Sequence, residues 1–137
     1  MRLLLLLLPL LLTSCAQQQD PEQLLENYLQ ISDRGELEAF DEVLTGSALT
    51  AAKDANALMN GLGLEQRGQT SFYALESFSD SEFEFCLDVS KTRIIDSSGV
   101  DQTPPERPLQ VPMTMKIESF ADLTKISELN IRRFESC

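Results

Sequence analysis

Few side chains in this sequence suggest a specific chemistry, and the most informative are the three cysteines. They are Cys15, Cys86 and Cys137, in a chain of 137 residues that contains no histidine. The usual Ser–His and Cys–His nucleophile pairs are therefore excluded. A zinc site is disfavoured for the same reason, so we expect neither a metal nor another cofactor, and no catalytic residue is assigned.

Cys15 follows a segment with the composition of an export signal. Met1 and Arg2 precede an apolar run over residues 3–12, which is interrupted only by Pro9. About ten residues of helix extend about 15 Å, half the thickness of a hydrocarbon core of about 30 Å. The run is too short to span a membrane and predicts a secretory signal peptide.

The end of this segment, Leu12-Thr13-Ser14-Cys15, resembles the lipobox of bacterial lipoproteins. In that family the cysteine thiol is acylated and the preceding peptide is removed. The resemblance implies a signal peptide over residues 1–14, lipid attachment at Cys15 and a short polar leash through residue 19. An ordinary secretory signal followed by a chance cysteine is the alternative. With two or three acyl chains, membrane attachment is effectively permanent, on the extracytoplasmic face of the cell membrane.

The charge of the chain narrows the choice of partners. Once Arg2 is removed with the signal peptide, 10 basic and 22 acidic residues remain, a formal charge of −12. Nucleic acid is disfavoured because its binding needs a basic surface. Anionic headgroups would also repel this domain, so the membrane contact is expected to depend on the lipid.

Cys86 and Cys137 remain available for a disulfide. The compartment outside the cytoplasm permits such a bond. Because Cys15 is assigned to lipid, only these two cysteines are left to pair. Two free thiols, or an intermolecular bond through Cys137, are the alternatives. Closing a loop of about fifty residues would stabilise the fold by about 4 kcal/mol. By simple alternation Cys86 falls on the polar face of its strand, so the bond would lie on an outer face or need a bulge.

The elements that must position these residues divide into a helical half and a strand half. Asp20, Pro21 and Gln23 predict a capped helix start, and Gly35 ends that helix. Further helices are predicted over residues 37–44 and from a Ser47 cap to Asn60. Strands are predicted over 70–78, from 83 to 89 with continuation to 95, over 109–117 and over 123–134. Pro112 implies that its strand starts late, bulges or lies at an edge.

This order predicts one α+β domain over residues 20–137, with N-terminal helices packed on a curved antiparallel sheet of about four strands. It resembles the NTF2-like (cystatin-like, SnoaL-like) cones, and more closely small actinobacterial lipoproteins with such a domain. The residues that carry the likeness are Cys86, Asp88 and Ser90, the turn at 96–99, and Cys137. The resemblance implies a bond between Cys86 and Cys137. Members of the group usually carry a Trp in the last hairpin, where this chain offers Phe120 or Leu123.

Three functions are compatible with these observations. The first is a non-catalytic module that binds a small apolar ligand or assists an envelope protein, and we expect it to be a monomer. The second is an isomerase or cyclase that uses a carboxylate base and a Tyr donor, for which Tyr28 and Tyr73 are the only tyrosines. The third is a surface interaction or inhibitory protein. The acidic row of Glu82, Glu84 and Asp88 is predicted to be a solvated face, and residues 96–101 a hairpin turn rather than a calcium loop.

Overall fold

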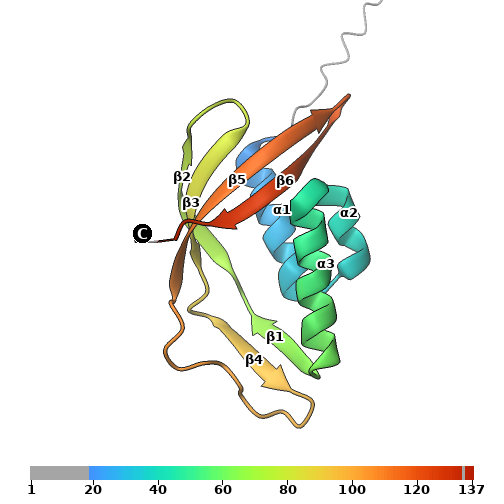
Figure 1. Cartoon of the computed structure of the whole chain (residues 1–137), viewed down its shortest axis with the longest axis vertical. Coiled ribbons are helices and arrows are strands. Elements are labelled where there is room, and N and C mark those ends of the chain that lie inside the picture. Colours follow the sequence, from blue (N-terminus) through green and yellow to red (C-terminus); the bar gives the residue numbers. More distant parts are fainter. Residues whose placement is uncertain (1–18, 134) are drawn as a thin grey trace, which may run out of the picture.

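Three α-helices lie against one side of an antiparallel sheet in this computed structural model, which describes residues 19–133 and 135–137 (Figure 1). The helices, with one short 3-10 turn, are α1 (Pro21–Arg34), η1 (Leu37–Ala39), α2 (Phe40–Val43) and α3 (Gly46–Gly61). The strands are β1 (Leu64–Gly68), β2 (Ser71–Ser77), β3 (Glu82–Asp88), β4 (Thr92–Asp96), β5 (Gln110–Phe120) and β6 (Leu123–Ile131). The predicted α+β class is confirmed. The described residues hold two sheets, ordered β2-β3-β5-β6 and β1-β4, rather than one sheet of about four strands.

Helix α1 begins and ends as predicted, with one correction. The Asp20 side chain accepts a hydrogen bond from the Glu22 N–H, and Gly35 closes the helix in a left-handed conformation with φ 66°. Gln23 does not complete a capping box. Its amide donates instead to Glu26 and Asn27, one turn further along the helix.

The start of α3 is held by the sheet rather than by the predicted Ser47 cap. Thr45 occupies the N-cap position without a capping side-chain bond, and its N–H donates to the Ile126 carbonyl at 2.8 Å. The Ser47 hydroxyl donates to the Ser127 carbonyl at 3.2 Å. A nearby β6 carbonyl therefore draws the serine away from the capping role that its sequence position favours.

The four-stranded sheet follows the predicted alternation. Phe83 pairs with Met115 and Phe85 with Met113, so the apolar side chains of β3 and β5 share the face that covers the helices. Pro112 lies at the end of the β5–β6 ladder, which begins at Met113, so its missing N–H removes no bond from the middle of that ladder.

The predicted continuation of the β3 strand to residue 95 is wrong. The Asp88 carboxylate accepts from the Ser90 N–H at 2.9 Å, and the Thr92 N–H donates to the Val89 carbonyl, so the chain turns between β3 and β4. Strand β4 then pairs with β1, a strand the sequence analysis missed because residues 64–68 contain a single apolar side chain. A Cβ on Gly68 would lie 2.0 Å from the Lys91 carbonyl oxygen, so only glycine fits where the end of β1 meets the start of β4.

The buried core lies where the helices meet the four-stranded sheet. Its members come from α1, α2, the link between α2 and α3, the start of α3 and three strands: Leu24, Leu25, Leu29, Phe40, Val43, Leu44, Ala48, Phe83, Phe85, Met115, Ile117 and Ile126. No residue of β1 or β4 belongs to this apolar cluster in the described chain. The two-stranded sheet extends the fold beyond the core, below α1 and beside the lower half of α3 in the view of Figure 1.

Candidate functional site

A hollow of about 450 Å³ lies between the last turns of α1, the second half of α3 and the two-stranded sheet. Its apolar walls include Leu37, Phe40, Ala52, Ala55, Met59, Leu64 and Ile94, and its polar walls include Tyr28, Ser32, Asp33, Asn56 and Gln66. This volume is within the range of small-molecule sites, which combine apolar walls with a few polar groups.

The hollow exists because most of the large core side chains lie outside it. Helix α1 buries Leu24, Leu25 and Leu29, and then continues with the polar Ser32 and Asp33. Helix α3 buries only Ala48, and it presents the small Ala52 and Ala55 to the hollow further along. Small side chains on one wall and a short sheet on the other leave the space unfilled.

Tyr28 is the most unusual side chain in the hollow. Its ring packs on Phe40 with centroids 6.2 Å apart, and its hydroxyl has no hydrogen bond to any described residue. Burial raises the pKa of this phenol above its ordinary value of 10.0, and the nearby Asp33 charge raises it further. The hydroxyl is therefore protonated at neutral pH and can donate to an acceptor in the hollow.

Asp33, beside Tyr28, is fully engaged by the start of β2. One carboxylate oxygen accepts from the Thr70 N–H at 2.7 Å, and the other accepts from the Thr70 hydroxyl at 2.6 Å and the Gln66 amide at 3.1 Å. The carboxylate ties the end of α1 to the link between β1 and β2. Sequence reasoning missed this role because Asp33 only interrupts an apolar stripe, and its partners lie more than thirty residues away.

Of the two tyrosines considered as donors for an isomerase, Tyr28 lines the hollow and Tyr73 does not. Tyr73 lies on the outer face of β2, opposite Cys86, and is 41% exposed, while Tyr28 lines the hollow on the other side of the sheet. The Tyr28 ring packs against the core, and the residue also lines the hollow.

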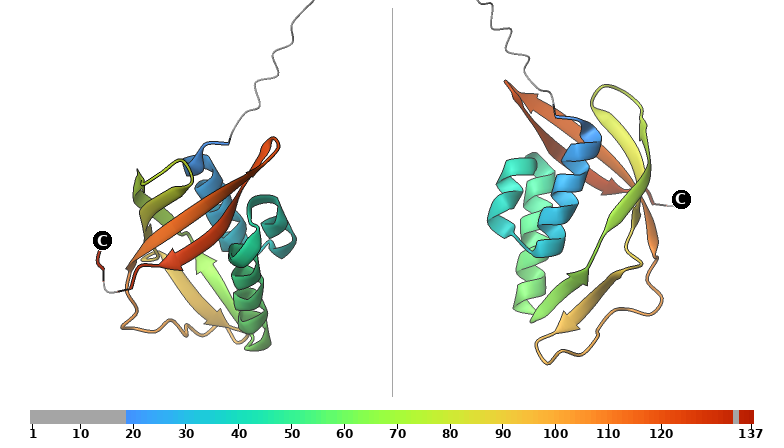
Figure 2. Two further views of the ribbon diagram at one scale, coloured as in Figure 1. Left: turned by 45° about the horizontal axis from the view of Figure 1, so that its top comes forward. Right: turned by 180° about the vertical axis from the view of Figure 1, so that it is seen from behind.

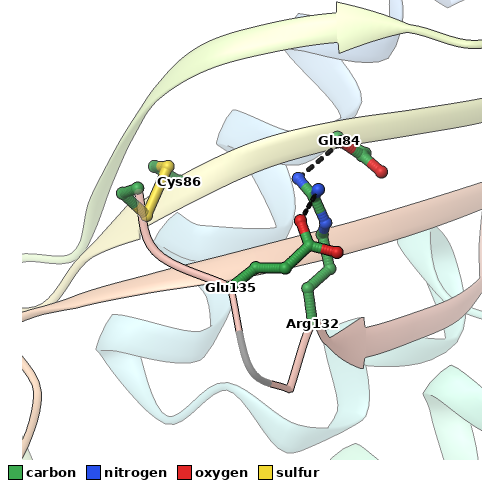
Figure 3. Close-up of a disulfide and its surroundings, with 5 residues drawn as sticks. Glu84, Cys86, Arg132 and Glu135 are labelled. Carbon is green, nitrogen blue, oxygen red and sulfur yellow. Dashed lines mark ion pairs between the residues drawn. A yellow bond between two sulfur atoms is a disulfide. The ribbon is translucent and has the colours of Figure 1, made fainter.

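The disulfide between Cys86 and Cys137 is present, with Cα atoms 5.8 Å apart, and it lies on the outer face of β3 as alternation predicted (Figure 3). Beside it, the Arg132 guanidinium pairs with both Glu84 and Glu135. This arrangement fixes the C-terminal segment against the sheet. Cys15, the predicted lipid attachment site, lies outside the described residues.

The acidic row on β3 is only partly free. Glu82 is exposed, Glu84 is paired with Arg132, and Asp88 accepts from the Ser90 N–H. Hydrogen bonds from the Ser90 side chain and then its backbone hold the pKa of the Asp88 carboxyl below its ordinary value. A continuous anionic strip for a basic partner is not formed by these three residues.

Residues 96–101 form the predicted turn, closed around a single carboxylate. Asp96 accepts from the Ser98 N–H and the Val100 N–H, each at 2.9 Å, and from the Gln102 amide. The Val100 bond, followed by the Gln102 bond, lowers the pKa of this carboxyl. Its oxygens are occupied by the turn, and no cluster of three metal-ligating residues occurs in the described ranges.

Arg107 is a second structural residue that the sequence did not indicate. Its guanidinium donates to the Thr92 hydroxyl at 2.9 Å, to the Val89 carbonyl at 2.9 Å and to the Thr92 carbonyl at 2.6 Å. These bonds fasten the proline-rich connection between β4 and β5 to the turn before β4.

Solved structures of similar fold include the following two. The intermembrane space region of the chloroplast protein ARC6 has a TM-score of 0.59 and 16% identity, over 80% of this chain and 92% of that one. A protein from Catenulispora acidiphila, in complex with S-DNPA, has a TM-score of 0.52 and 13% identity, over 80% of this chain and 87% of that one. The chain shares their α+β fold. At these identities the likeness shows the fold alone.

No protein-family model matches the sequence, and no curated protein matches it either. Within residues 19–133 and 135–137, no helix combines the length and the apolar composition needed to cross a membrane.

Proposed function

We propose that this chain is a lipid-anchored extracytoplasmic lipoprotein whose hollow binds a small, largely apolar ligand that carries a hydrogen-bond acceptor. The observation that carries the proposal is the protonated Tyr28 hydroxyl, which lacks a described protein partner and lines a hollow of about 450 Å³. A phenol hydroxyl that no described protein group engages can donate to an acceptor on a ligand in the hollow.

The fold and the sequence each support part of this proposal. The Catenulispora acidiphila protein of similar fold is in complex with S-DNPA, which supports a binding role for a domain of this fold. The ARC6 region belongs to an intermembrane space, which agrees with a domain that works outside the cytoplasm. The lipobox-like segment ending at Cys15 supplies the anchor, as in the small actinobacterial lipoproteins that the sequence resembles.

An isomerase is the less favoured alternative. Among the described residues, the carboxylates that line the hollow are Asp33 and Glu65, and it is the Asp33 charge that acts on Tyr28. Hydrogen bonds from Thr70 and Gln66 engage both Asp33 oxygens. A general base must be free to accept a proton from the substrate. Asp33 is better suited to holding the wall of the hollow.

Native mass spectrometry of the full chain, exported by a bacterium and released in detergent, tests three parts of the proposal at once. We expect acyl mass on Cys15, a mass two hydrogens lighter than the dithiol form, and a retained small molecule. Binding of an environment-sensitive apolar dye then provides a titration for variants.

A matched pair of substitutions tests the hollow itself. Ala55→Phe fills the hollow, whereas Ala57→Phe adds the same ring on α3 at a position that does not line it. We expect the first variant to abolish dye binding and the second to retain it. Tyr28→Phe should weaken an acceptor-bearing ligand by about tenfold, the value of one hydrogen bond. Equal dye affinity in Ala55→Phe and the wild type would contradict the proposal.

A further inference from the structure

One end of the domain gathers the start of α1 and two hairpin turns, and we refer to it as the apical end (Figures 1 and 2). Glu82, the first residue of β3, pairs with Lys116, so the β2–β3 turn lies at the level where β5 approaches its end. The β5–β6 hairpin runs further, to the pair of Phe120 and Leu123. It projects beyond the body of the domain in all three views.

Contacts along α1 place its first residues at this same end. Asp33, in the last turn of α1, bonds to Thr70 just before β2 begins. Glu22, in the first turn, shares a groove with Leu75 near the other end of β2. Helix α1 therefore runs opposite to β2, and the chain enters the domain beside the two hairpin turns (Figure 2).

The apical end exposes large apolar side chains that have no role in the core. Phe78 in the β2–β3 turn is 64% exposed, and Phe120 and Leu123 are 47% and 57% exposed. As direct cross-strand partners on either side of a tight turn, Phe120 and Leu123 have adjacent side chains. Together they form an apolar tip on a projecting hairpin.

The short segment from Cys15 to Gln19 limits which exposed apolar residues can reach a membrane. Leu58, Leu62 and Val100 are also exposed, but they lie near the opposite end of the domain, at the end of α3 and beyond β4. From Cys15 to Gln19 the extended chain spans at most about 14 Å. A lipid on Cys15 would therefore hold the apical end within that distance of the bilayer.

We propose that the β5–β6 hairpin tip inserts Phe120 and Leu123 into the interfacial layer of the bilayer, next to the lipid anchor. This inference rests on the acylation of Cys15 in the proposed function. Interfacial segments bury their apolar side chains about 5–10 Å into the headgroup and acyl boundary. The hollow, beside Gly35, Asn60 and Leu64, then faces away from the membrane and is open to ligands from solution.

The acidic residues of the apical end favour a bilayer with neutral headgroups. Five exposed acidic residues occur in or beside these apical segments: Asp20, Asp80, Glu82, Glu118 and Asp122. Anionic headgroups would repel them, so insertion depends on apolar burial rather than on charge. The tip should enter neutral phosphatidylcholine better than phosphatidylglycerol.

Tryptophan fluorescence tests the orientation directly, because the chain has no tryptophan. The full acylated protein is reconstituted in phosphatidylcholine vesicles, with Phe120→Trp or Leu123→Trp as apical probes and Leu58→Trp as the control at the opposite end. We expect both apical probes to shift to the blue and to be quenched by lipid with brominated acyl chains, at least about twofold more than Leu58→Trp. Two apical probes protect the test against misfolding of one variant.

The outcomes separate the orientation from the anchor on which it rests. Vesicle-bound protein with acyl mass on Cys15, in which both apical probes are quenched no more than Leu58→Trp, overturns the orientation and leaves the anchor intact. A chain without acyl mass on Cys15 overturns the anchor, and the orientation with it. Equal quenching in phosphatidylglycerol and phosphatidylcholine vesicles would overturn the preference for neutral headgroups.

Discussion

The two ends of the helical layer differ in how they are filled. Toward the apical end, α1, α2 and the first turn of α3 pack their large apolar side chains on β3, β5 and β6, with Leu24, Leu25 and Ile126 fully buried. Toward the other end, α1 and α3 face β1 and β4 across a hollow of about 450 Å³. The same two helices are thus core elements at one end and walls of a cavity at the other.

In this small domain, the packed region supplies stability and the region around the hollow is available for binding. Deep packing in the first region supplies most of the hydrophobic stabilisation, since that scales with the apolar area removed from water. The second region depends on hydrogen bonds, through Asp33 at one side and Arg107 at the other. A site held by polar contacts at the margin of a packed core can stay open without collapsing.

The largest effect is expected from the disulfide, which closes the packed region on its outer face. Cys137→Ser releases a loop with a sequence separation of 51 residues and should lower the free energy of unfolding by about 4 kcal/mol. Urea denaturation of the oxidised wild type and the variant measures this difference. Cys86→Ser should match it within error, and wild-type stability that does not respond to a reducing agent would contradict the assignment.

The same substitution in the two regions gives the sharpest comparison. Met115→Ala, at a side chain 1% exposed in β5, should cost about 3 kcal/mol because it leaves a cavity in a packed core. Met59→Ala, in the wall of the hollow, should cost less than about 1 kcal/mol, since its surroundings are already open. Urea denaturation of both variants tests this, and equal losses would break the distinction between the two regions.

A polar contact should matter more beside the hollow than on the open surface. Asp33→Ala leaves the Thr70 N–H and hydroxyl without their acceptor and should lower stability by about 2 kcal/mol. The control is Asp41→Ala, which removes a solvent-exposed ion pair with Lys53 and should cost less than about 1 kcal/mol. Thermal and urea unfolding would measure both losses of stability. A larger loss in Asp41→Ala than in Asp33→Ala would contradict the prediction.

The smallest effect is expected from the Asp96 turn, and it depends on pH. Its folded-state pKa is lowered, so the ionised carboxylate stabilises the fold above the unfolded-state pKa of about 3.9, and this contribution is lost as the pH falls through the folded value. Asp96→Asn should therefore lose less stability than the wild type when acidified below about pH 4. Parallel acid denaturation curves would show that the turn does not contribute in this way.

Local signals predicted most of the helices and the four-stranded sheet. Asp20 and Gly35 mark the ends of α1 through their own capping chemistry, and the alternation of Phe83, Phe85 and Leu87 marks β3. Failures occurred where a distant partner decided the local structure. Ser47 turns from capping to a β6 carbonyl, and residues 64–68 form a strand only because β4 lies beside them.

The candidate site was the least predictable part. Tyr28 lies among the apolar side chains of α1, and the sequence of α1 does not show that the side chains facing Tyr28 are too small to fill the space beside it. Asp33 and Thr70 meet across a sequence separation of 37 residues, beyond the reach of any local pattern. The disulfide was predictable because the number of cysteines and their expected compartment constrained it before any geometry was known.

By itself the sequence determined the apolar segment over residues 3–12, the acidic charge, the candidacy of Cys86 and Cys137 for a disulfide and the α+β order, because each depends on composition or on periodicity along the chain. Only the tertiary structure decided that β1 and β4 form a separate sheet and that a hollow opens behind Tyr28. It also decided that the hairpin tip lies beside the chain's entry. These features depend on which distant surfaces meet, and on where the available side chains are too small to fill the space between them.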